Sequence, residues 1–505
     1  MLASVPTFAL VGVDSHEVTV EVDVRRGLPA FTVVGLPDAA VREARERVRA
    51  ALLNSQLDFP LQRLTANLAP ASVRKAGPSF DLALAAGVLV ASDQVPADAL
   101  ERTAVCGELS LSGLLRPVRG ALSGALAARR AGYERLIVPE GNAGEAALSD
   151  DLEVLGVPSL RQLVELLHGR WQPEPATPQV RPVRDRVDEP DMADVRGQVD
   201  AKRALEIAAA GGHNVLMVGP PGAGKTMVAR RLPGILPPPS LDEALEITRI
   251  HGAAGLGDGR LATERPFRAP HHTISPQGLV GGGSVPRPGE ITLAHRGVLF
   301  LDEVAEFSRS SLEALRQPLE DGQAQIVRGQ RSLTFPARAM LVAACNPCPC
   351  ARPREECRCN EVDRLRYGRR LSGPLIDRIY LVCQAEAPRA VELVSAGGGC
   401  DRSPAIRERV VAARERQHRR LAGTCALCNA DMDGRLTRRH AALGGEVAER
   451  LLGSVESGSL TGRGHDRVLR LARTVADLAG RERIMPDDLD EALAYRLAPR
   501  APIAA

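Results

Sequence analysis

The spacing of apolar positions predicts a chain of mixed α and β structure. Residues 18–24 and 31–35 have the pattern of strands, whereas residues 38–54 and 79–91 have the spacing of helices. Both kinds of segment follow one another within residues 1–168, as they do in a compact α/β domain. We therefore expect the chain to begin with such a domain.

Two stretches rich in proline or glycine divide the chain. Five prolines lie between residues 169 and 193, where helices and strands cannot continue, and a weaker, glycine-rich break follows at 395–404. At 505 residues the chain has room for about three domains. We predict an α/β domain at 1–168, a linker at 169–193, a second α/β domain at 194–394 and a mostly helical domain at 395–505.

The strongest motif lies in the second domain. The sequence GPPGAGKT at 219–226 follows an apolar run at 214–218 and precedes a helical pattern that starts at Met227. In this context, glycines let backbone N–H groups surround phosphate oxygens, Lys225 reaches the terminal phosphates and Thr226 binds magnesium. ATP and magnesium are therefore the expected cofactors.

Two further apolar runs in this domain end in polar side chains. The run at 297–301 leads to Asp302, which is expected to hold magnesium through water, and Glu303, which is expected to polarise the attacking water. The run at 339–344 leads to Asn346, which either orients the same water or is a plain polar residue at a strand end. The predicted ATP-binding residues are Gly219, Pro220, Pro221, Gly222, Ala223, Gly224, Lys225, Thr226 and Asp302.

Two arginines are candidates for the same reaction. Arg378 could reach a neighbouring subunit's ATP as an arginine finger, with a surface ion pair as the equal alternative. Arg463, at the start of a helical run, could close over the nucleotide from the C-terminal domain, and Arg467 is its nearest rival. The predicted activity is ATP hydrolysis by a motor of the AAA+ class.

Composition bears on the class of protein and on its expected location. Hydrophobic residues make up 44% of the chain and charged residues 25%, which is ordinary for a globular protein. The longest clean apolar run, at 82–91, is about half of what a bilayer needs, and residues 1–13 lack the basic residues of a signal peptide. We expect a cytoplasmic protein without a membrane partner. The net charge of +3 permits a nucleic-acid partner without requiring one.

Cysteines are concentrated directly after the apolar run at 339–344. Five of the ten cysteines lie between residues 345 and 359, and four of them form two Cys-x-Cys pairs. Four thiolates in one loop suit tetrahedral zinc, with plain reduced cysteines as the alternative. The predicted zinc ligands are Cys348, Cys350, Cys357 and Cys359. Cys425 and Cys428 lack a second pair nearby and are expected to be core thiols.

Several motifs together resemble the ComM/YifB family of magnesium-chelatase-like AAA+ proteins, nearly from end to end. The matching stretches are GLPAFTVVGLPD at 27–38, NLAPA at 67–71, GELSL at 107–111, FRAPHHT at 267–273, PGE at 288–290, LRQPLEDG at 315–322 and CNPCPC at 345–350. The family usually continues the last motif with glycine, whereas this chain has Ala351.

The resemblance implies a function beyond what the motifs alone give. It implies a hexameric ring that moves on single-stranded or branched DNA and drives branch migration of recombination intermediates in natural transformation. It also implies that Asn346 is sensor 1, that Arg378 is the arginine finger and that Arg463 is sensor 2. The alternatives are a chelatase-like ATPase that remodels a protein partner and, third, an ATP-dependent protease.

The first domain resembles the protease domain of Lon, which has the ribosomal S5 domain 2-like fold, and the resemblance can be tested on residues. Ser79 has the setting of Lon's serine nucleophile, but residues 121–123, where the lysine base should stand, are Ala, Leu and Ser. A serine without a base is a poor nucleophile. We expect a structural or regulatory domain in which Ser79 is a turn or helix-cap residue.

DNA contact must come from the backbone of the nucleic acid, because aromatic residues are only 3% of the chain. Residues 323–335 read as a hairpin that sets Arg328 and Arg331 beside its tip, where they meet phosphates or are merely solvated. His271 and His272 resemble a pair in a family insertion that faces the pore, with a plain loop as the alternative. The arginine-rich run at 407–420 is expected to be a solvated helix face.

Overall fold

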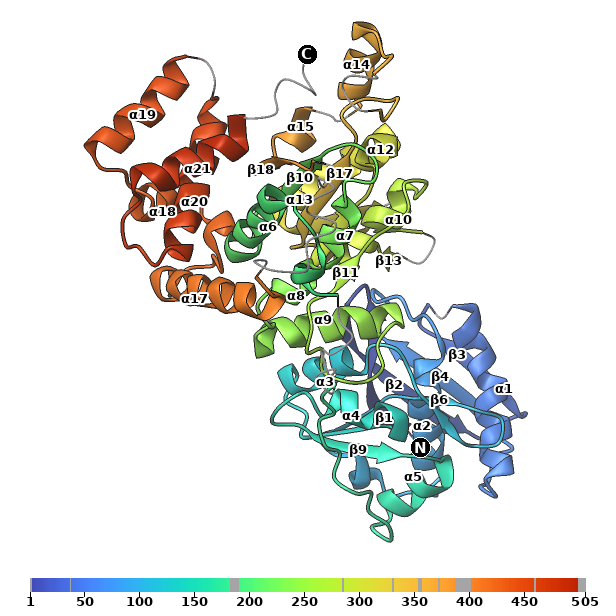
Figure 1. Cartoon of the computed structure of the whole chain (residues 1–505). Coiled ribbons are helices and arrows are strands. Elements are labelled where there is room, and N and C mark those ends of the chain that lie inside the picture. The colour runs from blue at the N-terminus through green and yellow to red at the C-terminus, as the bar shows by residue number, and fades with distance from the viewer. Residues whose placement is uncertain are drawn as a thin grey trace. The chain divides into compact units, whose positions relative to one another are not determined.

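The chain forms two compact units in the computed structural model, which describes residues 2–36, 38–181, 190–283, 286–328, 331–352, 357–370, 373–386, 401–457 and 460–497. Unit 1 consists of Met1–Val183 and Ser240–Thr263, and unit 2 of Arg184–Pro239 and Glu264–Ala505 (Figure 1). Both contain helices and β-sheet, so the predicted mixed α/β fold is confirmed.

Unit 1 is built around a four-stranded sheet of order β1-β2-β4-β3. Its strands are β1 (Leu2–Val11), β2 (Asp14–Arg25), β3 (Ala30–Val34) and β4 (Arg63–Ala69), and only the pairing of β3 with β4 is parallel. Val18, Val20 and Val22 of β2 are buried, which is the period of two that predicted the strand. A second, parallel sheet comprises β5 (Thr103–Val105), β8 (Arg135–Pro139) and β9 (Glu153–Val157).

The helix α2 (Asp81–Ala91) forms the centre of unit 1. Every one of its residues is buried, because the sequence is apolar on nearly all sides of the helix. It packs against β1, β2 and α1 (Ala39–Asn54). A Cβ on Gly87 would lie 2.6 Å from Cγ2 of Val22, so only glycine permits this approach of helix to sheet.

The segment Ser240–Thr263 carries the chain back to unit 1. Its helix α9 (Leu241–Ala254) begins with a capping box of Ser240 and Glu243 and packs beside α3 (Ala121–Arg130), as Figure 1 shows. Arg249 on α9 donates to the Asp14 carboxylate at 3.0 Å. This segment falls inside the predicted domain 194–394, and the division into three domains and a linker stays a prediction.

The core of unit 2 is a parallel five-stranded sheet of order β11-β14-β17-β10-β18. Its strands are β11 (Phe267–Arg268), β14 (Val298–Leu301), β17 (Met340–Cys345), β10 (Val215–Val218) and β18 (Leu381–Gln384). All residues of β10, β14 and β17 are buried, as expected for strands that are covered on both faces. Because the strands are parallel, the loops after them meet at one edge of the sheet.

Unit 2 ends in helices, as the sequence predicts. They are α17 (Ser403–Leu421), α18 (Gly434–His440), α19 (Gly445–Glu456), α20 (Gly462–Leu478) and α21 (Pro486–Leu497). Both α17 and α20 pack against α6 (Val199–Gly211), and α21 packs against β18. These contacts hold the helical part on the flank of the sheet that ends in β18.

The prediction that the arginines of residues 407–420 form a solvated face is wrong. Arg409 donates to the buried Glu206 carboxylate of α6 at 2.6 Å, and Arg414 donates to the Ala209 carbonyl at 3.0 Å. The cause is tertiary: α17 lies against α6, whose carbonyls and one carboxylate face it. Arg419 is an exception, because among the described residues its guanidinium donates to the Glu415 carbonyl of its own helix and to no other element.

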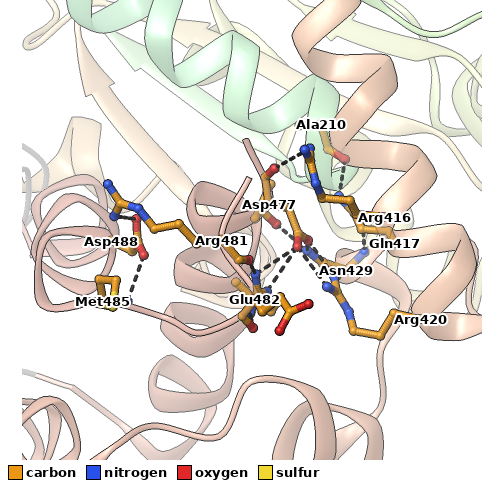
Figure 2. A network of polar contacts seen from close by, with 12 residues as sticks. Ala210, Arg416, Gln417, Arg420, Asn429, Asp477, Arg481, Glu482, Met485 and Asp488 are labelled. Atoms are coloured by element: carbon orange, nitrogen blue, oxygen red, sulfur yellow. Dashed lines mark hydrogen bonds and ion pairs between the residues drawn. The ribbon is translucent and has the colours of Figure 1, made fainter. Parts of the chain in front are cut away.

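A buried carboxylate joins α17 to α20 (Figure 2). Asp477 is fully buried and accepts hydrogen bonds from Arg420 at 2.5 Å, from Asn429 at 2.9 Å and from Arg473 at 3.2 Å. Gln417 extends the network by donating to the Ala210 carbonyl at 3.0 Å. Burial lowers the pKa of Arg473, and the negative charge of the adjacent Asp477 acts in the opposite direction.

The remaining elements connect these parts. In unit 1 they are β6 (Glu108–Leu109), β7 (Leu115–Arg116), α4 (Glu140–Ala146) and α5 (Leu160–Leu167). In unit 2 they are α7 (Lys225–Arg230), α8 (Leu232–Ile235), α10 (Pro276–Val280), β12 (Gly281–Gly282), β13 (Arg287–Pro288), α11 (Glu290–Leu293), α12 (Arg309–Ala314), α13 (Arg316–Asp321), β15 (Gln323–Arg328), β16 (Arg331–Pro336), α14 (Glu361–Gly368) and α15 (Gly373–Ile376). No helix among the described residues has the length and apolar character of a membrane span.

Candidate active site

The predicted phosphate loop connects β10 to α7 in unit 2. The helix begins at Lys225, two residues before the expected start at Met227. A Cβ on Gly219 would lie 2.1 Å from the Ala385 carbonyl oxygen, so the loop can pass β18 only with glycine there. Gly222 and Gly224 have φ of 78° and 86°, and no atom of the described residues lies within 4 Å of where their Cβ would be. The loop therefore borders open space, as a phosphate cradle must.

Lys225 lies at the centre of this loop. Its ammonium donates to the carbonyls of Gly219 at 2.7 Å and Pro220 at 2.9 Å, and to Oδ1 of Asn346 at 3.2 Å. Burial lowers the pKa of Lys225, and the nearby Asp302 and Glu303 act in the opposite direction. The lysine is thus a largely desolvated cation held by weak acceptors that phosphate oxygens can replace.

Thr226 and Asp302 lie where a magnesium ion is expected. The Thr226 hydroxyl donates to Oδ2 of Asp302 at 2.6 Å, although the two residues come from α7 and from the end of β14. One hydroxyl and one carboxylate leave several positions for water and phosphate oxygens, which is the ligand set that magnesium prefers. The residues present therefore fit the ion.

Glu303 has an uncommon backbone conformation next to this pair. Its φ is 49° and its ψ is 48°, the left-handed region that a residue with a side chain seldom adopts. The strain is stabilised locally, because its N–H donates to Oδ1 of Asp302 at 3.0 Å and its carbonyl accepts from Glu306 at 2.7 Å. The turn leaves the Glu303 side chain exposed to solvent.

Asn346 follows β17, which lies between β10 and β14 in the sheet. Its contact with Lys225 joins the third predicted strand end to the phosphate loop. Burial raises the pKa of the preceding Cys345 to about 12, so this thiol stays neutral beside Lys225. The structure therefore brings together Lys225, Thr226, Asp302 and Asn346.

The two predicted arginines come from other elements of unit 2. Arg378 is buried and forms an ion pair with Glu320, a residue of α13. Arg463 lies in the first turn of α20, but its side chain is outside the described residues. Arg467 on the same helix lies over the ring of Tyr380 at 5.8 Å, and burial lowers its pKa. The finger and sensor roles stay predictions.

The four predicted zinc ligands come together. The sulfur atoms of Cys348, Cys350, Cys357 and Cys359 all lie within 4.8 Å of one another. Cys348 Sγ is 3.3 Å from that of Cys350 and 3.6 Å from that of Cys357. Four ligands at about 2.3 Å from a tetrahedral zinc ion would be nearly 4 Å apart, so a small adjustment of the sulfur positions accommodates the ion. Ala351 turns the chain here with a φ of 57°.

The second Cys pair behaves differently. Cys428 is buried, but Cys425 is exposed, so the prediction of two core thiols is wrong for Cys425. The cause is local, because Cys425 lies in the connection between α17 and α18 rather than in a helix.

In unit 1, Ser79 lies in a short 3-10 turn before α2, as expected of a turn residue. Lys75 is buried and its ammonium donates to the Pro70 carbonyl, and among the described residues no hydrogen bond joins it to Ser79.

The predicted hairpin is present. β15 and β16 are antiparallel, and Arg328 pairs with Arg331 at the end of the ladder, although both side chains lie outside the described residues.

The two predicted histidines differ in exposure. His271 is exposed, whereas His272 is half-buried with Nδ1 4.0 Å from Oε2 of Glu303. The sequence alone did not suggest this last contact, because it depends on β11 lying next to β14.

Comparison with known protein families gives matches along most of the chain. The family models described as "Magnesium chelatase, subunit ChlI", "Subunit ChlI of Mg-chelatase" and "Magnesium chelatase, subunit ChlI C-terminal" match residues 191–393, 20–142 and 401–496.

Similar proteins extend over nearly the whole chain. An uncharacterized protein of Mycobacterium tuberculosis is 45% identical over 97% of both chains. The uncharacterized protein YifB of Escherichia coli and the competence protein ComM of Haemophilus influenzae are each 42% identical over 98% of this chain and 97% of their own. A shorter match, 32% identical over 28% of this chain, is to Lon protease 2 of Bacillus subtilis.

Proposed function

Because the chain belongs to the ComM/YifB family of magnesium-chelatase-like AAA+ ATPases, we propose that it is an ATP-driven motor that translocates on DNA. The proposed reaction is branch migration of recombination intermediates, as in natural transformation. The relative in Haemophilus influenzae is named a competence protein, which supports this direction. The finer assignment rests on the arrangement of the nucleotide site and the hairpin within unit 2.

The observation that carries the proposal is the place of the hairpin in the sequence. It is inserted in the chain between two strands that are neighbours in the sheet of unit 2. β15 and β16 lie in the sequence between β14, which leads to Asp302 and Glu303, and β17, which leads to Asn346. A movement of the hairpin can therefore accompany a change at either strand end. Two arginines in register at its tip suit the phosphates of a nucleic acid, whose backbone supplies most sequence-independent affinity.

The described side chains divide the work of hydrolysis. Lys225 and the loop amides would bind the terminal phosphates, Thr226 and Asp302 would hold the magnesium ion, and Asn346 fixes the lysine. Magnesium, when bound, neutralises charge that develops on the phosphate oxygens. Glu303 orients and polarises the attacking water and accepts its proton.

A homo-oligomeric ring completes the proposal. Arg378 as finger requires a neighbouring subunit, and its release from Glu320 would accompany assembly. We expect size-exclusion chromatography with light scattering to give a hexamer in the presence of an ATP analogue. A monomer at micromolar concentration under these conditions would contradict the ring.

Zinc is proposed as a structural ion in the loop between β17 and α14. Elemental analysis of the purified chain should give about one zinc per chain, because four thiolates form a closed site. Cys357→Ser should lose the ion, whereas Cys425→Ser, at an exposed cysteine outside the cluster, should keep it. Chains that fold normally without metal would establish plain reduced cysteines instead.

The experiment that tests the function is ATP hydrolysis with and without forked or three-stranded DNA. The wild-type rate should rise with DNA, and Lys225→Ala and Glu303→Gln should abolish both the basal and the stimulated rate. Hydrolysis that is indifferent to every DNA would favour a chelatase-like ATPase that acts on a protein partner.

A further inference from the structure

The ends of two neighbouring strands bring a histidine to the catalytic glutamate. β11 pairs in parallel with β14, with Phe267 opposite Val298 and Arg268 opposite Leu299. The loop after β11 therefore runs beside the loop after β14. In this position Nδ1 of His272 lies 4.0 Å from Oε2 of Glu303.

Glu303 has a fixed backbone and an exposed side chain. The hydrogen bonds of its N–H and carbonyl hold the left-handed turn in place, but the side chain is 57% exposed. A carboxylate in this state samples several rotamers, most of which do not point at the attacking water. In the part of the chain that the structure describes, His272 brings a ring nitrogen within 4.0 Å of this carboxylate.

His272 is itself held from two sides. Its ring lies 4.0 Å from that of His271 and meets the ring of Phe307 edge-on at 6.5 Å, and Phe307 is buried. The loop is tied to α12, because the Ser311 hydroxyl donates to the Ile274 carbonyl at 3.0 Å. The imidazole is therefore the less mobile member of the pair.

We infer that His272 is a positioning residue for Glu303 in ATP hydrolysis. An imidazole N–H, brought closer by a small rotation or linked through one water, donates to Oε2 and leaves Oε1 to accept a hydrogen bond from the attacking water. His272 contacts neither the nucleotide loop nor the metal pair in the described structure, so it acts through Glu303. The inference rests on ATP hydrolysis by this chain and not on the proposed action on DNA.

The first test separates turnover from binding in the full-length protein. His272→Ala should lower kcat by about tenfold, while KM and the Kd for a non-hydrolysable ATP analogue change less than about twofold. His272→Gln, which keeps a donor of similar reach, should restore kcat to within about threefold of wild type. The matched control is His418→Ala, at an exposed histidine of α17.

The second test asks whether the effect passes through Glu303. Glu303→Asp shortens the carboxylate and withdraws it from the histidine, so adding His272→Ala to Glu303→Asp should change kcat by less than about twofold. Equal tenfold losses in both backgrounds would overturn the inference, as would unchanged or raised kcat in His272→Ala. All rates are read with and without DNA, so absent stimulation in wild type contradicts only the DNA motor.

Discussion

Two regions of unit 2 carry conspicuous positive charge and use it in opposite ways. Lys225 donates to two loop carbonyls and an amide oxygen, all of which are neutral acceptors. Arg420 donates instead to the Asp477 carboxylate inside the packed helices (Figure 2). Arg473 donates to the same carboxylate. The lysine is left with charge that can bind an anion, whereas the charge of the arginines is already neutralised.

The difference shows that a cation's partners, rather than its place in a basic run, decide its role. A buried charge without an opposite charge is costly and persists where a ligand supplies one. A buried charge with its counter-ion contributes structural specificity, and removal of the partner lowers the stability of the fold. The two regions should therefore respond to substitution in opposite ways.

Lys225→Ala gives the largest expected effect. We expect ATP hydrolysis to fall by about 1,000-fold, because the terminal phosphates lose their charged partner in a desolvated site. The thermal midpoint should change by less than about 2 °C, since burial already disfavours this ammonium. A phosphate-release assay and circular dichroism measure the two quantities, and a large loss of stability would make Lys225 resemble the arginines.

Asp477→Asn should show the reverse pattern. Removing the carboxylate charge leaves Arg420 and Arg473 without their counter-ion, and we expect a loss of about 3 kcal/mol in the unfolding free energy. Asp490→Asn is the matched control, because its ion pair with Arg450 is exposed and should be worth less than about 1 kcal/mol. Urea unfolding followed by circular dichroism compares them, and equal losses would refute the distinction.

His213 offers a pH test at the contact between the sheet and the helices. Burial lowers its pKa to about 3, and its Nε2 lies 2.8 Å from the Thr474 hydroxyl of α20. Between pH 6.5 and 3 the unfolded chain binds a proton here that the folded chain does not, so this histidine makes stability fall as pH falls. The slope should reach about 1.4 kcal/mol per pH unit and should be absent in His213→Gln. Identical slopes for the two proteins in urea unfolding between pH 6 and 4 would contradict it.

The smallest expected effect lies within α17 itself. Arg419→Ala should change the unfolding free energy by less than about 0.5 kcal/mol, because within the described part of the chain this guanidinium bonds to its own helix alone. Arg420→Ala, one residue on, should cost about 3 kcal/mol because Asp477 would be left buried without this partner. Similar midpoints in urea for the two variants would show that the arginines of α17 act as a uniform surface after all.

Prediction from sequence reached further for the phosphate loop than for the packed helices around Asp477. The phosphate loop is predicted from a local motif, and Asp302 and Asn346 could be placed beside it because parallel strands bring their ends to one edge of a sheet. The role of α17 could not be predicted, since helical periodicity does not reveal that Glu206 of α6 would face Arg409. His272 was found beside Glu303 only through the neighbouring positions of β11 and β14. The segment Ser240–Thr263 likewise joined unit 1 through tertiary packing.

The most direct test of the central claim is displacement of a labelled strand from a three-stranded DNA junction in the presence of ATP and magnesium. Wild-type protein should convert the junction at a rate that follows ATP concentration, and Glu303→Gln should bind the junction without converting it. If wild-type protein hydrolyses ATP normally but leaves the junction intact, the DNA motor is contradicted.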